Sequence, residues 1–314
     1  MTVNRLQIRQ AMLSENVSMG LYGTATAGST TTLTDTTNLA VGGNSTSRFM
    51  SYFLYRPAAA TASDKFRRVT PTGYAPTTGV LTQGTPAWTI APLASSDSGY
   101  YELWQYDPVQ VNAAISRALT KRCFALERDL VTPNGQSRYD ITASPFSLPV
   151  TNVQDQILEI VQFYGTDPNA RIQPWQAAGK TWWPETDGAT LYVRFDTPPT
   201  GTIQVTWKKP YTALTDDSTT STVPLEYVAW ASFFELFDAL SKQAIARGES
   251  DAPWASLRQS AFDRYWTENH KYLDRFASQF FVSPAKGRTR GRGPVMGRTG
   301  SQLYGPGGAR ITGT

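Results

Sequence analysis

The residues of this 314-residue chain that are best suited to chemistry are cations near its C-terminus. Residues 283–314, the C-terminal arm, contain nine glycines, three prolines and no Asp or Glu. The cations of the arm are Lys286, Arg288, Arg290, Arg292, Arg298 and Arg310. Such a segment buries too little apolar area to offset its ordering entropy, so by itself it is expected to be disordered. The arm therefore indicates binding to a partner, and the alternative is a disordered terminus without a role.

The arm also carries the basic charge of the chain. The whole chain has 29 Lys and Arg against 25 Asp and Glu, a formal net charge of +4, and without the six arm cations the balance is 23 against 25, or −2. One kind of partner is a protein, because extended backbone can add to a neighbouring sheet or groove. The other is nucleic acid, bound through its phosphates without sequence readout. Leu303, Tyr304 and Ile311 favour the protein, because phosphates need no apolar anchors.

The sequence offers little for catalysis. Its one histidine, His270, has no second His and no Cys near it in sequence, so no metal site is expected. The chain contains no G-x-S-x-G, no G-x-x-x-x-G-K-[ST] and no G-x-G-x-x-G. Asp216 and Asp217 lie in a Ser/Thr-rich turn, where solvated carboxylates are expected. We therefore expect no enzyme, no metal and no cofactor, and a hydrolase is the least favoured alternative.

Cysteine and tryptophan residues admit simple interpretations. The single Cys123 cannot form an internal disulfide, and we expect it to be buried in a helix. Trp175, Trp182 and Trp183 lie close together in the stretch PWQAAGKTWWPE. We favour a loop cluster packed on protein, with a sugar-binding platform as the alternative.

The composition predicts a folded body whose surface contacts other protein. Apolar residues make up 40% of the chain and charged residues 17%, against about 25% charged in a typical soluble domain. Nine Trp and fifteen Tyr combined with so few charges indicate protein contacts rather than a fully solvated surface. The sequence has no apolar run of about 18 residues and no signal-peptide pattern at its start, so no membrane partner is expected.

The N-terminal third predicts a helix followed by strands. Residues 2–15 form the expected helix, with Thr2 as its N-cap and Leu6, Met12 and Leu13 on its apolar side. From Gly20 onward, dense Thr, Ser and Gly favour strands and turns. The expected strands lie in residues 47–57, apolar on both faces, in residues 65–74, closed by a turn at 71–73, and in residues 79–90. Together they predict a small antiparallel β domain over residues 20–95.

The rest of the body alternates between helix and strand patterns. Asp107-Pro108 starts a helix that is expected to reach about Leu126, with Gln110 completing a capping box. Residues 136–210 predict a second β region, with hairpin turns at 187–188 and 198–201. Residues 224–247 and 251–276 then predict an antiparallel pair of helices.

These elements define the expected fold class and domains. The class is α+β, with two antiparallel β regions attached to a layer of about three to four helices, and with the extended arm at the end. The expected division is a helix over residues 1–19, a β domain over 20–106, a core over 107–282 and the arm over 283–314.

Several stretches resemble the head–tail adaptor and neck (connector) proteins of tailed bacteriophages. Residues 205–240, VTWKKPYTALTDDSTTSTVPLEYVAWASFFELFDAL, resemble their final strand, Pro turn, acidic linker and Pro-started helix. The stretch YELWQYDPVQVNAAISRALTKR is similar to their helix with an aromatic–Asp–Pro start. GTATAGSTTTLTDTTNL and KFRRVTPTGYAPTTGVLTQGTPAW are similar to the β insert of larger neck proteins. The resemblance covers residues 2–275, and the chain differs from small adaptors in its long N-terminal β region and its arm.

This resemblance implies a structural role in the virion neck, after assembly in the host cytoplasm. The subunit would form a twelvefold homo-oligomeric ring below the portal protein, in contact with the tail or further neck proteins, with an axial channel for DNA. The arm would dock on the portal, with non-specific contact to packaged double-stranded DNA as the second interpretation. The expected lateral contacts, on the last two helices, are Phe233, Phe237, Trp254, Tyr265 and Tyr272. The alternatives are a capsid decoration, tail-tube or tail-terminator protein, and a host-receptor-binding protein.

Overall fold

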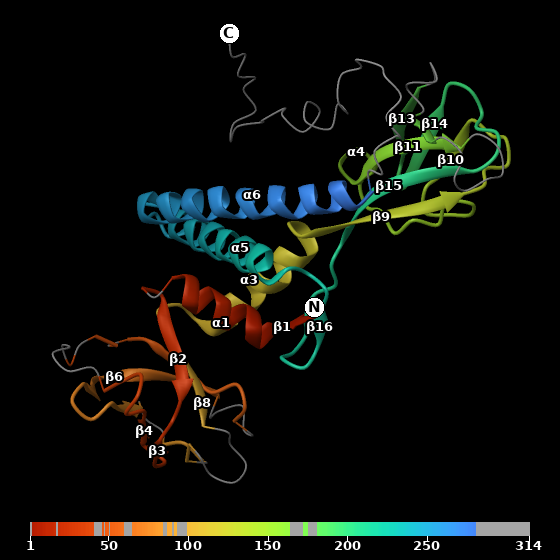
Figure 1. The fold of residues 1–314 in the computed structure, drawn as a ribbon. Coiled ribbons are helices and arrows are strands. Elements are labelled where there is room, and N and C mark those ends of the chain that lie inside the picture. The colour runs from red at the N-terminus through yellow and green to blue at the C-terminus, as the bar shows by residue number, and fades with distance from the viewer. Residues whose placement is uncertain are drawn as a thin grey trace, which may run out of the picture. The chain divides into compact units, whose positions relative to one another are not determined.

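The computed structural model has a mixed α+β fold, which confirms the expected class (Figure 1). It describes residues 2–16, 18–40, 46, 48–49, 51–59, 65–83, 87–89, 91–92, 99–163, 172–174 and 181–280. The chain divides into two compact units, Met1–Asp274 and Arg275–Thr314. The C-terminal arm and its expected docking residues lie outside the described residues.

The N-terminal helix begins later than its sequence suggests. Helix α1 spans Arg5–Glu15 and is capped by Asn4, whose side chain accepts from Gln7 N at 2.9 Å while Asn4 N donates to Gln7 Oε1 at 3.0 Å. The expectation that Thr2 forms the cap is wrong. Strand β1, Val3–Asn4, pairs with β16, Thr220–Ser221, and this pairing holds the residues after Thr2 in an extended conformation.

The first β region is one antiparallel sheet in the order β2-β8-β5-β6-β7-β4-β3. Its strands are β2 Gly20–Thr24, β3 Ala27–Gly28, β4 Thr32–Thr34, β5 Phe53–Tyr55, β6 Phe66–Ala75, β7 Val80–Gln83 and β8 Tyr100–Trp104. Leu33, Leu54, Leu81 and Leu103 lie in its core with almost no exposed surface. The expected antiparallel β region is confirmed, and β8 extends it to Trp104.

Two strand boundaries in this sheet differ from the sequence prediction. The strand expected over residues 47–57 is limited to β5, because Phe49 lies in a turn and Ser51 has a φ of 67°. The turn expected at residues 71–73 is wrong, because β6 continues through it. A register shift between Val69 and Tyr74 accommodates Pro71 within the strand pair.

Helix α3, Pro108–Lys121, begins as expected and ends early. Asp107 is the N-cap and accepts from Val109 N at 2.8 Å. Gln110 forms no capping box, since its side-chain amide donates to Gln243 at 3.4 Å. The chain then enters strand β9, Phe124–Val131, so the expected end near Leu126 is wrong. Each residue of β9 pairs with β15, and this pairing overrides the helical pattern.

The second β region consists of two antiparallel sheets. One has the order β12-β11-β15-β9, with β11 Ile157–Phe163, β12 Ile172–Pro174 and β15 Ile203–Pro210. The other has the order β10-β14-β13, with β10 Arg138–Asp140, β13 Trp182–Asp187 and β14 Thr190–Phe195. A short helix, α4 (Val153–Gln156), precedes β11. Gly188 forms the expected β13–β14 hairpin turn, with φ 61°, whereas residues 198–201 connect two different sheets and form no hairpin.

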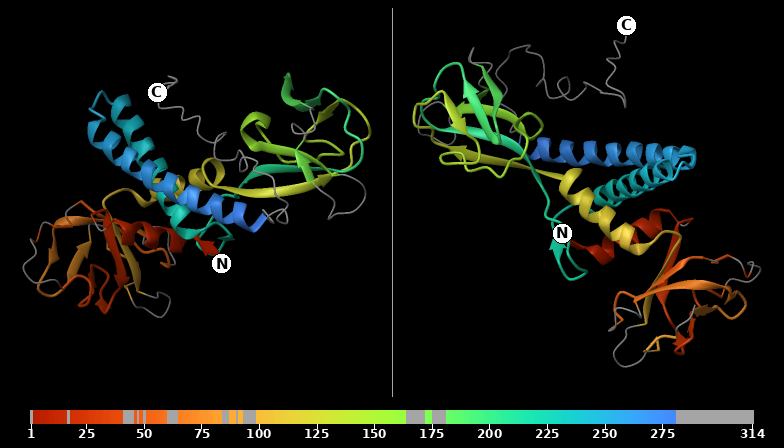
Figure 2. Two further views of the ribbon diagram at one scale, coloured as in Figure 1. Left: turned by 45° about the horizontal axis from the view of Figure 1, so that its top comes forward. Right: turned by 180° about the vertical axis from the view of Figure 1, so that it is seen from behind.

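The last two helices form the expected antiparallel pair. Helices α5, Leu225–Ala246, and α6, Ala252–Phe280, lie side by side in every view (Figures 1 and 2). Ring contacts confirm the direction, because Tyr227 stacks on Tyr265 and Phe234 contacts Phe262. Gly248 ends the first helix with φ 72°.

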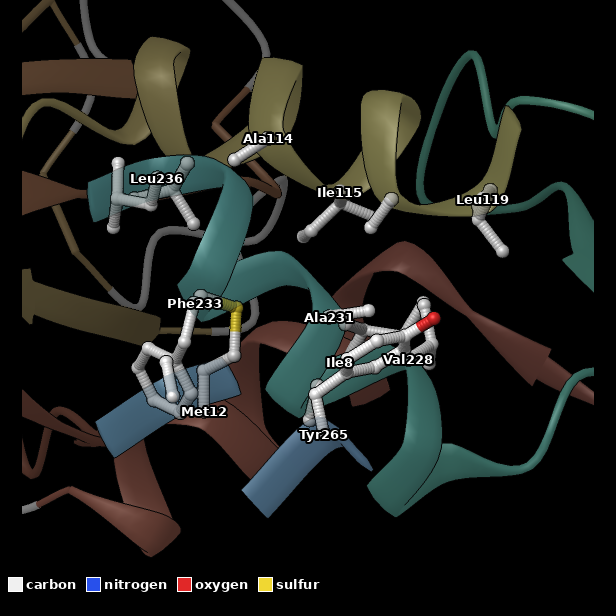
Figure 3. Packing of buried hydrophobic residues seen from close by; sticks show 14 of the residues in the cluster. Ile8, Met12, Ala114, Ile115, Leu119, Val228, Ala231, Phe233, Leu236 and Tyr265 are labelled. Atoms are coloured by element: carbon white, nitrogen blue, oxygen red, sulfur yellow. The ribbon is translucent and has the colours of Figure 1, made fainter. Parts of the chain in front are cut away.

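The central apolar core joins all four long helices. Ile8 and Met12 of α1, Ile115 and Leu119 of α3, and Val228 of α5 are fully buried and point toward one another (Figure 3). Helix α6 adds Ala261 and Tyr265. The N-terminal helix is therefore part of the helical layer and shares its core.

Candidate interaction surfaces

Most of the residues expected to form lateral contacts lie inside the chain. Phe233, Phe237 and Tyr265 are 0%, 3% and 8% exposed, and the Tyr265 hydroxyl donates to the carbonyl of Arg122 at 2.9 Å. These three residues fill the core, so their assignment to contacts between subunits is wrong. Trp254 is partly buried, and its ring centroid lies 5.8 Å from that of Tyr106. The side chain of Tyr272 lies outside the described residues.

A different set of aromatic residues joins α5 to α6 at the border of the core. Trp230 and Phe234 are one turn apart on α5, and Phe262 and Trp266 are one turn apart on α6. The ring centroids of Phe234 and Phe262 are 5.7 Å apart, and those of Phe262 and Trp266 are 5.9 Å apart in a stacked arrangement. We call these four residues the aromatic seam. They are only partly buried, and Trp266 remains 36% exposed.

Arginine side chains lie over the rings of the aromatic seam. The Arg122 guanidinium is 4.7 Å from the Phe234 ring centroid, and that of Arg264 is 5.8 Å from the Trp230 ring. Arg122 also donates to Glu235 Oε1 at 2.8 Å, which fixes its position. Aromatic residues and arginine are enriched in the energetically important part of protein interfaces. The seam could not be predicted from the sequence, because α5 is apolar on most of its circumference and its outward face has no distinct pattern.

A buried ionic network joins α1, β8 and the segment before β16. Arg9 Nε lies 3.1 and 2.9 Å from the two carboxylate oxygens of Glu102, and neither side chain has exposed surface. Arg9 Nη1 and Nη2 each donate to Asp217 at 2.8 Å. Nη1 also donates to Asn112 Oδ1 at 3.0 Å, and Trp104 Nε1 donates to Glu102 at 2.7 Å. Arg5 Nε also donates to Asp217 Oδ1 at 3.0 Å, so two cations face two carboxylates, as buried charges require.

The pKa values of the network follow from burial and pairing. Burial disfavours the charged form of Arg9, but hydrogen bonds to Asp217 and the charge of Glu102 raise its pKa. Burial alone would raise the pKa of Asp217, but the hydrogen bonds and charges of Arg9 and Arg5 hold it below its usual value. Burial raises the pKa of Glu102, and Arg9 acts against this change. The expectation of two solvated turn carboxylates therefore holds for Asp216, whose partners are Ser218 and Thr219, and is wrong for Asp217.

The tryptophans on β13 do not form a common platform. Trp182 packs against the core of the second β region, whereas Trp183 is 41% exposed with the Arg194 guanidinium 5.8 Å from its ring centroid. Neighbouring residues of a strand face opposite sides, so the two rings point away from each other. The loop expected here is wrong for both residues, and Trp175 lies outside the described residues.

Cys123 and the residues that could bind a metal ion bear on catalysis. Cys123 is fully buried, as expected, but follows α3 instead of lying within it, and burial raises the pKa of its thiol. Among the described residues, His, Cys, Asp and Glu form no group of three that could hold a metal ion. The side chain of His270 lies outside that set.

None of the described helices combines the length and the apolar character needed to cross a lipid bilayer. No protein-family model matches the chain, and no characterised protein matches it with significant similarity.

Proposed function

We propose that the protein is a structural virion subunit, a head–tail connector of a tailed bacteriophage. Identical subunits form a ring between the portal protein and the tail, and DNA passes through the axial channel. The observation that carries the proposal is the aromatic seam on the α5–α6 hairpin, where Trp266 remains 36% exposed beside Phe262. Partly exposed aromatic residues with arginines above them are suited to a partner surface. The sequence resemblance supplies the location in the virion.

The ring contact that we propose is heterologous, with the aromatic seam of one subunit against a different face of the next. A heterologous contact closes into a ring when the rotation between subunits fits a whole number of copies. The C-terminal arm then docks on the portal through its extended backbone, with Leu303, Tyr304 and Ile311 as apolar anchors.

Electron microscopy and native mass spectrometry of the purified full-length protein test the ring. We expect closed rings of one order, which dissociate in the Trp266→Ser variant. Leu257→Ser is the matched control, because Leu257 is equally exposed at 36% on the same helix and lies outside the seam. A full-length protein that stays monomeric at high concentration and in the virion would contradict the proposal. Densitometry of virions separates a connector from a decoration or tail-tube protein, which has many more copies per particle.

A further inference from the structure

Strand β2 is an unprotected edge of the first sheet. The strand order places it at one end, with β8 as its partner. Natural proteins protect edge strands with charged side chains, with proline or by making them very short. The sequence of β2, Gly-Leu-Tyr-Gly-Thr, has five residues and contains neither a charge nor a proline. An edge of this kind is a template for pairing with another strand.

The other described edge strands are protected. Strand β3 has only two residues. Strands β9 and β10 contain charged residues, namely Glu127, Arg128 and Asp129 in β9 and Arg138 and Asp140 in β10. Strand β12 contains Pro174, and β13 contains Pro184, Glu185 and Asp187. Among described edge strands longer than two residues, β2 alone lacks such a feature. Among these strands, the unprotected backbone edge is therefore found at β2 alone.

The hydrogen-bond pattern shows which groups β2 offers. At the two ends of the ladder, Gln105 N donates to Met19 O at 2.8 Å and Ala25 N donates to Gly99 O at 2.9 Å. Residues with odd numbers thus bond to β8, and the register between β2 and β8 is continuous. In an antiparallel pair the alternate residues point their backbone groups to the other side. The N–H and C=O groups of Tyr22 therefore face the open edge, where they bond to no other described residue.

A groove of about 890 Å³ runs along the whole of β2. This volume lies within the roughly 300–1,000 Å³ that is common for binding sites. The groove is lined by residues of α1, by Thr37 and Asn38, by Arg48, Phe49 and Tyr52, and by all five residues of β2. Tyr22 is 37% exposed, and its ring centroid lies 6.4 Å from that of Tyr100. Two tyrosine rings thus line the groove beside the open backbone, and the Tyr100 hydroxyl is bonded to Gln10 and Glu102.

Among the described residues that line the groove, Arg48 is the one that carries a charge. It is exposed, and the part of the groove that the structure describes contains no Asp or Glu. We propose that the groove binds an extended, carboxylate-bearing segment of another protein, which adds to the open edge of β2 as a further strand. The carboxylate pairs with Arg48. The basic C-terminal arm of the chain, which has no carboxylate side chain, does not fit this site. The inference does not rest on the connector function, because it uses only the edge, the groove and its charge.

The test is binding of a synthetic peptide to the full-length protein, measured by fluorescence anisotropy. The probe is an eight-residue peptide of alternating Thr and Val with one central Glu. Two derivatives carry N-methyl groups on alternate amides, one on each edge of the extended peptide. Because only one edge can pair with β2, we expect one derivative to lose at least tenfold in affinity, while the other binds like the parent. Equal binding of both derivatives, or no binding of the parent, would overturn the proposal.

Two pairs of variants assign the contacts. Tyr22→Pro removes the outward N–H, and Tyr22→Thr removes the ring while the N–H remains, so the proline variant is expected to bind more weakly. Arg48→Gln is expected to lose roughly two- to fivefold, as for an exposed ion pair, and Arg48→Glu to prefer a peptide with Lys in place of Glu. Since Tyr22→Pro can fail to fold, its melting temperature is measured, and the Arg48 pair tests the proposal independently. If Arg48→Glu still prefers the Glu peptide over the Lys peptide, the carboxylate does not pair with Arg48. If deletion of residues 284–314 tightens peptide binding, the arm itself occupies the groove. Either result would contradict the proposal.

Discussion

Arg9 and Glu102 are charged side chains without exposed surface, and their partners determine whether such burial is tolerable. Taking two charges out of water costs several kcal/mol, so a single buried pair is weak evidence for stability. In this chain Asp217, Asn112 and Trp104 satisfy the remaining donors and acceptors. The pairs connect residues 93 and 208 positions apart, so the network specifies which elements meet.

Removing one member of this network is expected to be strongly destabilising. Arg9→Met leaves Glu102 buried without its cation, and we expect the free energy of unfolding to fall by about 3–5 kcal/mol. Adding Glu102→Leu to Arg9→Met should restore part of this loss, because no uncompensated carboxylate then remains at that position. Denaturant unfolding of the two single variants and the double variant measures the coupling. Additive losses would show that the two side chains act independently.

The network also predicts that the stability of the fold depends on pH. The folded-state pKa of Asp217 is below its usual value of 3.8, so its contribution to stability is present above that value and is lost as the pH falls through the folded-state pKa. The Asp217→Asn variant should therefore be less stable than the parent at pH 7, and the difference should shrink below about pH 4. Unfolding free energies measured across this range test the sign. Asp263→Asn, on the exposed side of α6, is the control and should show little difference at either pH.

At the scale of elements, the turn after α5 depends on the backbone of one glycine. Gly248 has φ 72°, and a Cβ atom built there would meet no other atom within 4 Å. Gly248→Ala is therefore strained by its backbone alone, and we expect a loss of roughly 1 kcal/mol of unfolding free energy. Gly248→Asn should lose less, because Asn tolerates the left-handed region. If Gly248→Ala and Gly248→Asn lose the same unfolding free energy in thermal or denaturant unfolding, the loss comes from side-chain packing and not from backbone strain.

Local signals in the sequence predicted helices and turns better than they predicted strand partners. Asp107 and Gly248 mark a helix start and a helix end through local backbone chemistry, so both were predictable. Strand β9 was not predictable from local signals, because its conformation depends on pairing with β15, some eighty positions away. The cap lies at Asn4 and not at Thr2 because Val3 pairs with Ser221, and this pairing has no local signal in the sequence.

The same limit applies to the interaction surfaces. Apolar periodicity places Phe233 and Tyr265 on the apolar faces of their helices. It cannot distinguish a side chain in the core of the subunit from one in a contact between subunits. The aromatic seam became visible only when α6 was placed against α5. Arg9 did carry a signal, because a cation between Ile8 and Met12 interrupts an apolar face, although its partners are remote in sequence.

For the whole molecule, the body and the C-terminal arm are expected to have separate roles. Deletion of residues 284–314 should leave the melting temperature of the body unchanged, because a glycine-rich segment of this composition has too little apolar area to contribute to a core. Under the proposed connector function, the same deletion should prevent heads from joining tails, as measured by the yield of complete particles. Normal yield would show that the arm does not dock.

A second arm variant separates the two kinds of partner. Replacing the six arm cations by Gln keeps Leu303, Tyr304 and Ile311, so a portal contact carried by backbone and apolar anchors should be retained. A contact with DNA phosphates would be lost, together with its salt dependence. The yield of complete particles is measured for this variant and compared with the yield for the deletion of residues 284–314.

The reach of the Arg9 network has a consequence for synthesis of the chain. Arg9 leaves the ribosome 208 residues before Asp217, a delay of about 10–40 s at the usual rate of translation. During that interval Arg9 can meet Glu102 but not Asp217, and the first helix lacks the part of its core that α5 supplies, so nascent chains are open to chaperones and proteases. A product truncated before Asp217 cannot close the network, so incomplete chains should be cleared by proteases.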